Sequence, residues 1–137
     1  MYFVNRPDPT FPYLPYLIQR SEGYFEYQLP VSVKGVLVTD DSVLLVGNPR
    51  GEFELPGGKL ELGETPAGCV AREIEEVTEL QVKVAQPVHA WVYEITPSRH
   101  VFVMAYGVII EGGAKAAKIL ASPEVGHAGW TPLLSID

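Results

Sequence analysis

Six glutamates and one arginine gather between residues 55 and 80 of this 137-residue chain, and a pair of glycines precedes all of them. Glu73 and Glu76 are three residues apart, a spacing that places two side chains on neighbouring parts of one helix face. Carboxylates held together repel one another unless positive charge lies between them, and Arg72 supplies only one charge. A divalent cation therefore suits this cluster. Because the acidic side chains offer only oxygen ligands, we expect Mg²⁺ or Mn²⁺ rather than Zn²⁺.

A loop followed by a helix would position these carboxylates. Pro56-Gly57-Gly58 cannot continue a regular strand, so a loop is expected there. Thr65 is a suitable N-cap residue, and Pro66 suits the first helical position. Apolar residues at helical spacing then predict a helix over residues 66–79 with one buried stripe. The members of this stripe are Ala67, Val70, Ala71, Ile74 and Val77. The alternative is a solvated acidic helix that binds no metal.

Residues 58–80 resemble the Nudix box, usually written G-x5-E-x7-R-E-U-x-E-E-x-G-U with U an aliphatic residue. The positions in register with it are Gly58, Glu64, Arg72, Glu73, Ile74, Glu76 and Leu80. Two positions depart from the pattern. Val77 replaces the second glutamate of the E-E pair, and Glu79 replaces the glycine. The first departure bears on activity, because that glutamate is commonly a direct metal ligand in the family.

The resemblance implies an α+β domain, built as an α/β/α sandwich around a mixed β-sheet. It also implies metal-assisted attack of water on a diphosphate linkage in a nucleotide or nucleoside diphosphate derivative. The metal ligands that it implies are Gly57, through its carbonyl, and the carboxylates of Glu73, Glu76 and Glu124. Glu124 lies in a loop after the sheet, where many members of the family bring in a further glutamate as ligand or base.

The same resemblance gives Arg72 a supporting part in catalysis beside Glu73, Glu76 and Glu124. Arg72 lies one turn before Glu76, so its guanidinium can fix a carboxylate by paired hydrogen bonds. Glu64 is expected to support the cluster without binding the metal. For each of these residues, the alternative is a loop or cap position without a catalytic task.

The formal net charge of −7 opposes nonspecific attraction to nucleic-acid backbones, so we expect a small anionic substrate rather than nucleic acid. Such a substrate needs local positive charge besides the metal. Arg50, Lys59 and Arg99 are the candidates for substrate binding. Trp91 and Tyr93 lie two apart on a predicted strand and could frame a nucleobase, although aromatic residues on strands more often belong to the core.

The length of 137 residues suits a single core, and 20% charged residues with 47% hydrophobic residues describe a globular protein. No apolar run approaches the roughly 18 residues that cross a bilayer, and the N-terminus lacks the pattern of a secretory signal. We therefore expect no membrane partner. A lone cysteine permits a reducing compartment, and we expect the protein to be cytoplasmic.

Several strands should surround the predicted helix. Residues 31–38 and 42–46 are rich in β-branched and aliphatic side chains and predict a hairpin near the sheet centre. Residues 53–55 predict a short strand that leads into the loop. Two strands, 82–85 and 88–95, are expected to be separated by Pro87, and residues 101–110 should form a central strand. Trp130 lies in a predicted last strand, and Asp137 ends the chain where a further helix would start.

Residues 1–30 differ in composition from the expected Nudix-like domain at residues 31–137. They hold eight of the twelve Phe and Tyr residues and five of the twelve prolines, which predicts an arm or an extra strand. Residues 24–29 alternate as a short strand would. The arm either packs its aromatic residues on its own domain, forms a homodimer contact, or offers a platform to a base.

Two other classes of function compete with hydrolysis. The loss of a glutamate at Val77 is compatible with a Nudix-fold module that binds a nucleotide or a protein partner without turnover. The aromatic arm is compatible with an interaction protein that dimerises. A release assay on a panel of nucleotide derivatives distinguishes the enzyme from the binding module.

Overall fold

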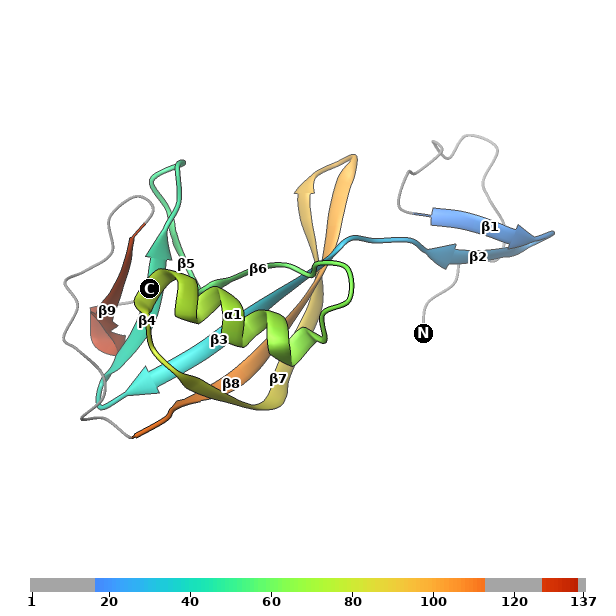
Figure 1. Cartoon of the computed structure of the whole chain (residues 1–137). Coiled ribbons are helices and arrows are strands. Elements are labelled where there is room, and N and C mark those ends of the chain that lie inside the picture. The colour runs from blue at the N-terminus through green and yellow to red at the C-terminus, as the bar shows by residue number, and fades with distance from the viewer. Residues whose placement is uncertain (1–16, 113–126, 136–137) are drawn as a thin grey trace.

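A mixed β-sheet with one helix on its face forms the centre of the molecule (Figure 1). The computed structural model describes residues 17–112 and 127–135. The strands of the sheet follow the order β5-β4-β3-β8-β7, with β6 paired to β3 and β9 paired to β4. Their bounds are β3 Val31–Thr39, β4 Ser42–Gly47, β5 Phe53–Glu54, β6 Gly57–Lys59, β7 Val82–Thr96, β8 Arg99–Ile110 and β9 Ala128–Pro132. The expected α+β architecture with a mixed sheet is confirmed.

Strand β3 connects the two halves of the sheet. It forms the predicted hairpin with β4, but only the pairs Val38–Val43 and Thr39–Ser42 join them. Along the rest of its length, β3 runs parallel to β8 and antiparallel to β6. Strand β8 lies between β3 and β7, which confirms the expected central strand.

One prediction was wrong for strand β7. Residues 82–96 form a single strand instead of two strands separated by Pro87. The pairing of β7 with β8 shifts register on both sides of Pro87, so the strand is irregular there but continues. The reason is the place of β7 at the end of the sheet, because the missing N–H of a proline is tolerated on an edge strand.

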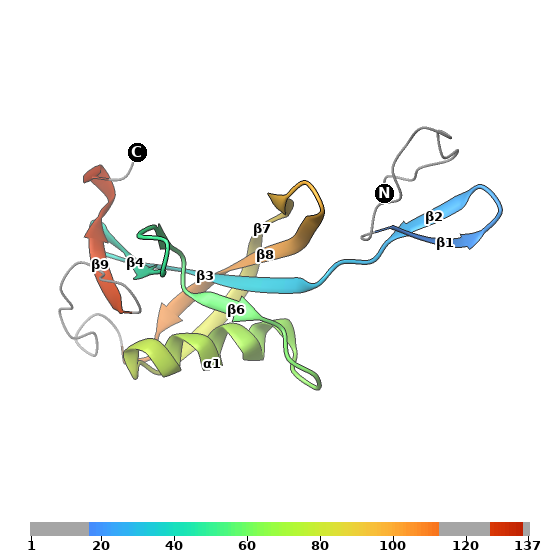
Figure 2. The same ribbon diagram turned by 90° about the horizontal axis from the view of Figure 1, so that it is seen from above.

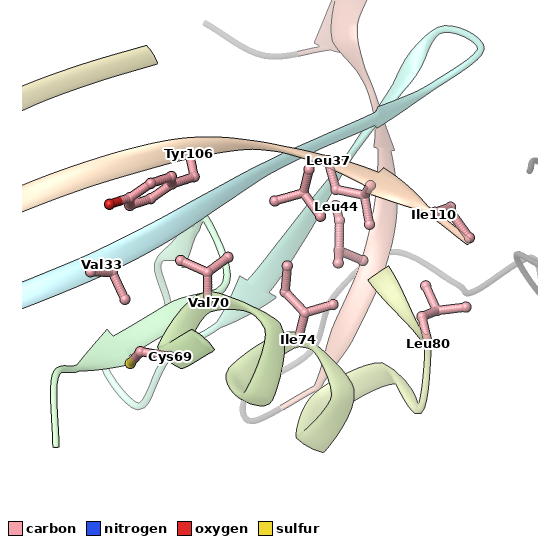
Figure 3. Packing of buried hydrophobic residues seen from close by; sticks show 10 residues of the cluster. Val33, Leu37, Leu44, Cys69, Val70, Ile74, Leu80, Tyr106 and Ile110 are labelled. Atoms are coloured by element: carbon pink, nitrogen blue, oxygen red, sulfur yellow. The ribbon is translucent and has the colours of Figure 1, made fainter. Parts of the chain in front are cut away.

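Helix α1, Pro66–Thr78, lies along one face of the sheet (Figure 2). The core fills the space between them and includes Val33, Leu37, Val70, Ile74 and Tyr106 (Figure 3). Gly35 allows the close approach, since a Cβ there would lie 2.8 Å from Ile74 Cδ1 and 3.0 Å from Val70 Cγ1. No second α-helix occurs among residues 17–112 and 127–135, so the other helical layer of the expected sandwich is not seen in that part of the chain.

The buried side of α1 differs from the predicted stripe at two positions. Val70 and Ile74 are fully buried as predicted, but Val77 is 38% exposed and Cys69 is fully buried. Cys69 lies against the loop before the helix, where its Sγ contacts the carbonyl oxygen of Lys59 at 3.5 Å. Val77 lies in the last turn, beyond that loop. The valine therefore does not extend the core of the helix.

The predicted start and end of α1 are confirmed to within one residue. Thr65 is the N-cap and accepts a hydrogen bond on Oγ1 from the Gly68 amide at 3.1 Å, and Pro66 is the first helical residue. At the other end Glu79 adopts a left-handed conformation with a φ of 61° and closes the helix. Glycine commonly occupies such a position, so Glu79 terminates the helix without the usual residue.

Strands β1, Leu17–Ser21, and β2, Tyr24–Tyr27, form a separate two-stranded hairpin. Both views show this hairpin standing clear of the main sheet (Figures 1 and 2). At the opposite end of the chain, β9 carries Trp130 as predicted, and the short 3₁₀ turn η2 follows at Leu133–Ser135. No helix in the described part of the chain is long and apolar enough to cross a membrane.

Candidate active site

Two glycines bring a loop against the helix. Gly57 begins β6 with a φ of 154°, and a Cβ on it would overlap the carbonyl oxygen of Val33 on the neighbouring strand. A Cβ on Gly58 would overlap the carboxylate of Glu73. Both positions therefore need glycine, the first for its backbone conformation and the second to leave room for Glu73. The predicted loop is in fact partly a short strand, since β6 pairs with β3.

Arg72 lies at the centre of four carboxylates. Its Nε and Nη2 donate to the two oxygens of Glu64 at 2.6 and 3.0 Å. Its Nη1 lies 3.1 Å from Glu76 and 3.3 Å from Glu73, and its Nη2 lies 3.1 Å from Glu61. The paired hydrogen bonds thus go to Glu64, whereas Glu76 receives a single one. Glu61 was not predicted from the sequence to belong to this cluster. The signal that could have revealed it is its position three residues before Glu64.

The carboxylates of the cluster differ in their electrostatics. The hydrogen bonds from Arg72, assisted by one from the Glu61 amide, lower the pKa of Glu64 to about 2. Burial acts in the opposite direction on Glu73 and raises its pKa. Its side chain is 22% exposed. The pKa of the Cys69 thiol rises to about 11, chiefly through burial, so the thiol stays protonated near neutral pH.

Part of a ligand set for a hard cation is present. Glu73 and Glu76 approach the same nitrogen of Arg72, and the Glu73 carboxylate lies against Gly58 next to Gly57. Carboxylates and backbone carbonyls are the donors that Mg²⁺ and Mn²⁺ prefer. In the described residues no group of three acidic, histidine or cysteine side chains is close enough to hold a metal. Glu124, the fourth member of the predicted ligand set, lies outside the described residues.

A cavity of about 310 Å³ gathers residues from four strands, β3, β5, β7 and β8, and from the loop between β4 and β5. Its lining consists of Lys34, Asn48, Arg50, Glu52, Phe53, Glu54, Trp91, Tyr93 and Val103. Asn48 is buried and shapes the loop, because its Oδ1 accepts hydrogen bonds from the amides of Arg50 and Glu52 at 2.9 and 3.0 Å. Trp91 and Tyr93, for which a place in the core was weighed against a frame for a base, therefore lie in one cavity with Arg50.

The three predicted substrate cations do not come together in this cavity. Arg50 lines it, with its Nε 2.7 Å from Glu52. Lys59 lies on β6 beside the carboxylate cluster, and Arg99 lies at the start of β8. Lys34 was missed by the analysis of the sequence. The signal was the single charged residue of the strand at residues 31–38, since such a residue must leave the core side of the strand.

The NUDIX domain family matches residues 28–136 of the chain. An ADP-ribose pyrophosphatase from Methanocaldococcus jannaschii is 36% identical over 113 residues, which are 78% of this chain and 67% of that protein. A MutT-like protein from Streptomyces ambofaciens is 45% identical over 73 residues, 52% of this chain and 47% of the relative. This chain thus matches only about half of the length of the Streptomyces protein.

The comparison with solved structures indicates the same family as these relatives. A MutT protein from Bacillus halodurans has a TM-score of 0.59 at 26% identity, over 76% of this chain and 69% of that one. The chain belongs to the Nudix family and has the Nudix fold. It is homologous to Nudix pyrophosphohydrolases, the class expected from the sequence.

Proposed function

We propose that the chain hydrolyses a diphosphate linkage in a nucleotide or nucleoside diphosphate derivative, with Mg²⁺ or Mn²⁺ at the carboxylate cluster. One observation carries this proposal: Glu73 and Glu76 both approach Nη1 of Arg72, beside the glycine pair that admits Glu73. The family membership and the pyrophosphatase name of the Methanocaldococcus relative support the reaction class. The lone cysteine, which is buried, is compatible with the cytoplasm as the place of this activity.

In this proposal the residues of α1 have distinct tasks. Glu76 is the first metal ligand, and Glu73 and the carbonyl of Gly57 are the next two ligands. Arg72 positions the carboxylates, because its guanidinium contacts both Glu73 and Glu76 while Glu64 holds it by paired hydrogen bonds. Glu124 is proposed as a further ligand or base. When bound, the cation would neutralise phosphate oxygens and favour attack by water.

The test is a product-release assay, in which the phosphomonoester or pyrophosphate products are separated by chromatography, on nucleoside triphosphates, ADP-ribose, NADH, dinucleoside polyphosphates and nucleotide sugars, with and without Mg²⁺. We expect Mg²⁺-dependent release from at least one substrate and its loss in Glu76→Gln, with an unchanged melting temperature. The matched control is Glu75→Gln on the exposed side of the same turn. Wild-type turnover in Glu76→Gln would remove Glu76 from the site, and no release from any substrate would refute the hydrolase.

A second candidate function rests on Val77. Its side chain is apolar and 38% exposed, at a position where the family commonly has an acidic metal ligand. Without that ligand, the chain would be a weakened Nudix module that binds a nucleotide or a protein partner without turnover. Such a module would bind nucleotides in a calorimeter and release no product from the whole panel. The enzyme releases product from at least one member, so the same panel separates the two functions.

A further inference from the structure

Lys34 lies on the face of the sheet that turns away from α1. Its neighbour Gly35 packs under the helix, where a Cβ would meet Ile74 and Val70, and Val33 belongs to the core. Successive side chains of a strand point to opposite faces, so Lys34 points away from that core. Even so, its side chain is only 18% exposed, because the cavity residues surround it. A lysine so enclosed needs an explanation.

Three aromatic side chains line the same cavity. Trp91 and Tyr93 lie two apart on β7 and share its face, and Val103 pairs with Trp91 from β8. Phe53 reaches the cavity from β5. Tyr93 is 51% exposed and Phe53 is 56% exposed, so both have ring surface open to a ligand. A nucleobase is flat and aromatic, and rings of this kind stack on such side chains.

The two cations of the cavity are engaged to different degrees. Arg50 lies 2.7 Å from Glu52, which is a close ion pair. The Nζ of Lys34 has two long contacts, 3.5 Å to Glu54 and 3.4 Å to the carbonyl oxygen of Leu55. An ammonium group has three hydrogens to donate. Arg50 also keeps N–H groups beyond Nε, but its side chain is 67% exposed, against 18% for Lys34, so Lys34 is the cation that a ligand inside the cavity would meet. The two glutamates balance the two cations, so the lining is formally neutral in a chain of net charge −7.

Lys34 also connects the cavity to the carboxylate cluster. It is paired with Gly57 across β3 and β6, and its Nζ contacts the carbonyl of Leu55 just before the glycine pair. Gly58 follows Gly57 in the chain and lies against the carboxylate of Glu73. A ligand group held by Lys34 thus lies beside Leu55, on the segment that leads into the glycine pair, and on the face of the sheet opposite to α1.

We propose that the cavity binds the nucleoside monophosphate part of the substrate, with the base against Trp91, Tyr93 and Phe53 and the phosphate on Lys34. This inference rests on the proposed hydrolysis and assigns two of its specificity elements, the aromatic walls and the lysine. It makes Lys34 a binding residue, since its ammonium group touches the substrate.

The experiment measures binding by tryptophan fluorescence in EDTA, so that neither metal nor turnover enters. The chain has two tryptophans, and Trp130 packs against the core cluster, so quenching should come from Trp91 and disappear in Trp91→Phe. The probes are AMP, adenosine and ribose 5-phosphate. In the wild type we expect AMP to bind about tenfold more tightly than adenosine, as one charge-assisted hydrogen bond allows. Ribose 5-phosphate should bind more weakly than AMP.

Lys34→Met should lower the affinity for AMP to that for adenosine and leave adenosine binding unchanged. Lys34→Arg should restore most of the preference for AMP. The matched control Lys83→Met removes the same charge from an exposed position of β7 and should behave as the wild type. Tyr93→Ala, which leaves Lys34 in place, should weaken AMP and adenosine by the same factor.

Several results would overturn the assignment. Equal loss of AMP and adenosine binding in Lys34→Met would mean that the lysine only supports the walls of the cavity. Ribose 5-phosphate binding as tightly as AMP would refute the aromatic base site, and so would quenching that survives in Trp91→Phe. If no probe binds while the release assay shows hydrolysis, this inference fails and the proposed function stands. If AMP binds as described but nothing is hydrolysed, the proposed function fails instead.

Discussion

Arg72 donates from Nε to one oxygen of Glu64 at 2.6 Å and from Nη2 to the other at 3.0 Å, across eight residues of sequence. This contact fastens the loop before α1 to the second turn of the helix. It also leaves Nη1 directed at Glu73 and Glu76. Glu64 therefore acts on the proposed metal ligands through Arg72 rather than by direct contact, as is common for residues that support a metal site.

The first prediction concerns the stability of this contact against pH. Arg72 lowers the pKa of Glu64 from 4.5 to about 2. A carboxylate whose pKa falls on folding stabilises the folded chain above its unfolded pKa, and this contribution is lost as the pH falls through the folded value. We therefore expect Glu64→Gln to be less stable than the wild type at pH 6. The difference should shrink between about pH 4.5 and 2, as measured by urea unfolding at each pH.

The control for this measurement is Glu111→Gln, at an exposed position after β8. The stability of this variant should change with pH as that of the wild type does. The comparison thus separates the effect of Glu64 from the general effect of losing one negative charge. If the stability difference between Glu64→Gln and the wild type is constant from pH 6 to 2, the ionised form of Glu64 does not contribute to the stability of the folded chain.

The second prediction concerns the glycine beside Glu73. A Cβ at Gly58 would overlap the Glu73 carboxylate, so Gly58→Ala should displace that carboxylate and lower turnover by about 10- to 100-fold, as other changes around metal ligands do. The melting temperature should change little, because the side chain of Glu73 can move. Turnover of the variant with a panel substrate, measured over a range of Mg²⁺ concentrations, gives the result.

Gly107→Ala is the matched control, since a Cβ at this β8 position would meet only ordinary contacts at 3.7 and 3.8 Å. It should retain wild-type turnover. Full activity in Gly58→Ala would show that the position of Glu73 seen here is not the one used in the reaction.

The sequence was most informative where structure is determined locally. Thr65 and Pro66 predict the start of α1 because capping and proline geometry involve only neighbouring residues. The strand break expected at Pro87 was wrong, because the effect of a proline depends on whether its strand lies at the edge of the sheet. Edge position is a property of strand order, which residues 82–96 alone do not reveal.

The candidate site shows the same division between local and distant information. Spacing along one helix brings Arg72, Glu73 and Glu76 together, and the sequence reveals that spacing directly. The cavity combines β3, β5, β7 and β8, so its composition follows from strand pairing and not from any single motif. Lys34 was missed for this reason. Arg50 and Trp91 were considered separately, and only the fold places them together.

The third prediction concerns the aromatic N-terminal segment. The β1–β2 hairpin stands clear of the sheet in both views, and Tyr24 and Tyr27 are 37% and 43% exposed in the isolated chain. We expect residues 1–30 to contribute to a homodimer. Light scattering should give a dimer for the full chain and a monomer for a chain that begins at Gln28, where the family match starts. An unchanged monomer in both would exclude the contact, and a dimer in both would locate it elsewhere.

The last prediction concerns Val77, whose side chain is 38% exposed on the last turn of α1. At about 100° per residue, Val77 lies about 40° to one side of Glu73 and Glu76 about 60° to the other. A glutamate at 77 would therefore add a third carboxylate beside these two. Glu79 does not replace it, because it lies beyond the helix in a left-handed conformation. Since Val77 is not buried, introducing a charge there should cost little stability.

For a weakened enzyme, Val77→Glu should tighten Mg²⁺ binding and raise turnover by more than about tenfold. Val77→Gln is the matched control, because it has the same shape without the charge and should match the wild type. For a binding module, Val77→Glu should change Mg²⁺ affinity without creating turnover. Calorimetric Mg²⁺ titration beside the release assay on all three proteins decides between them. A wild type that binds Mg²⁺ and turns over as fast as Val77→Glu would mean that another group, such as Glu124, already supplies the missing ligand.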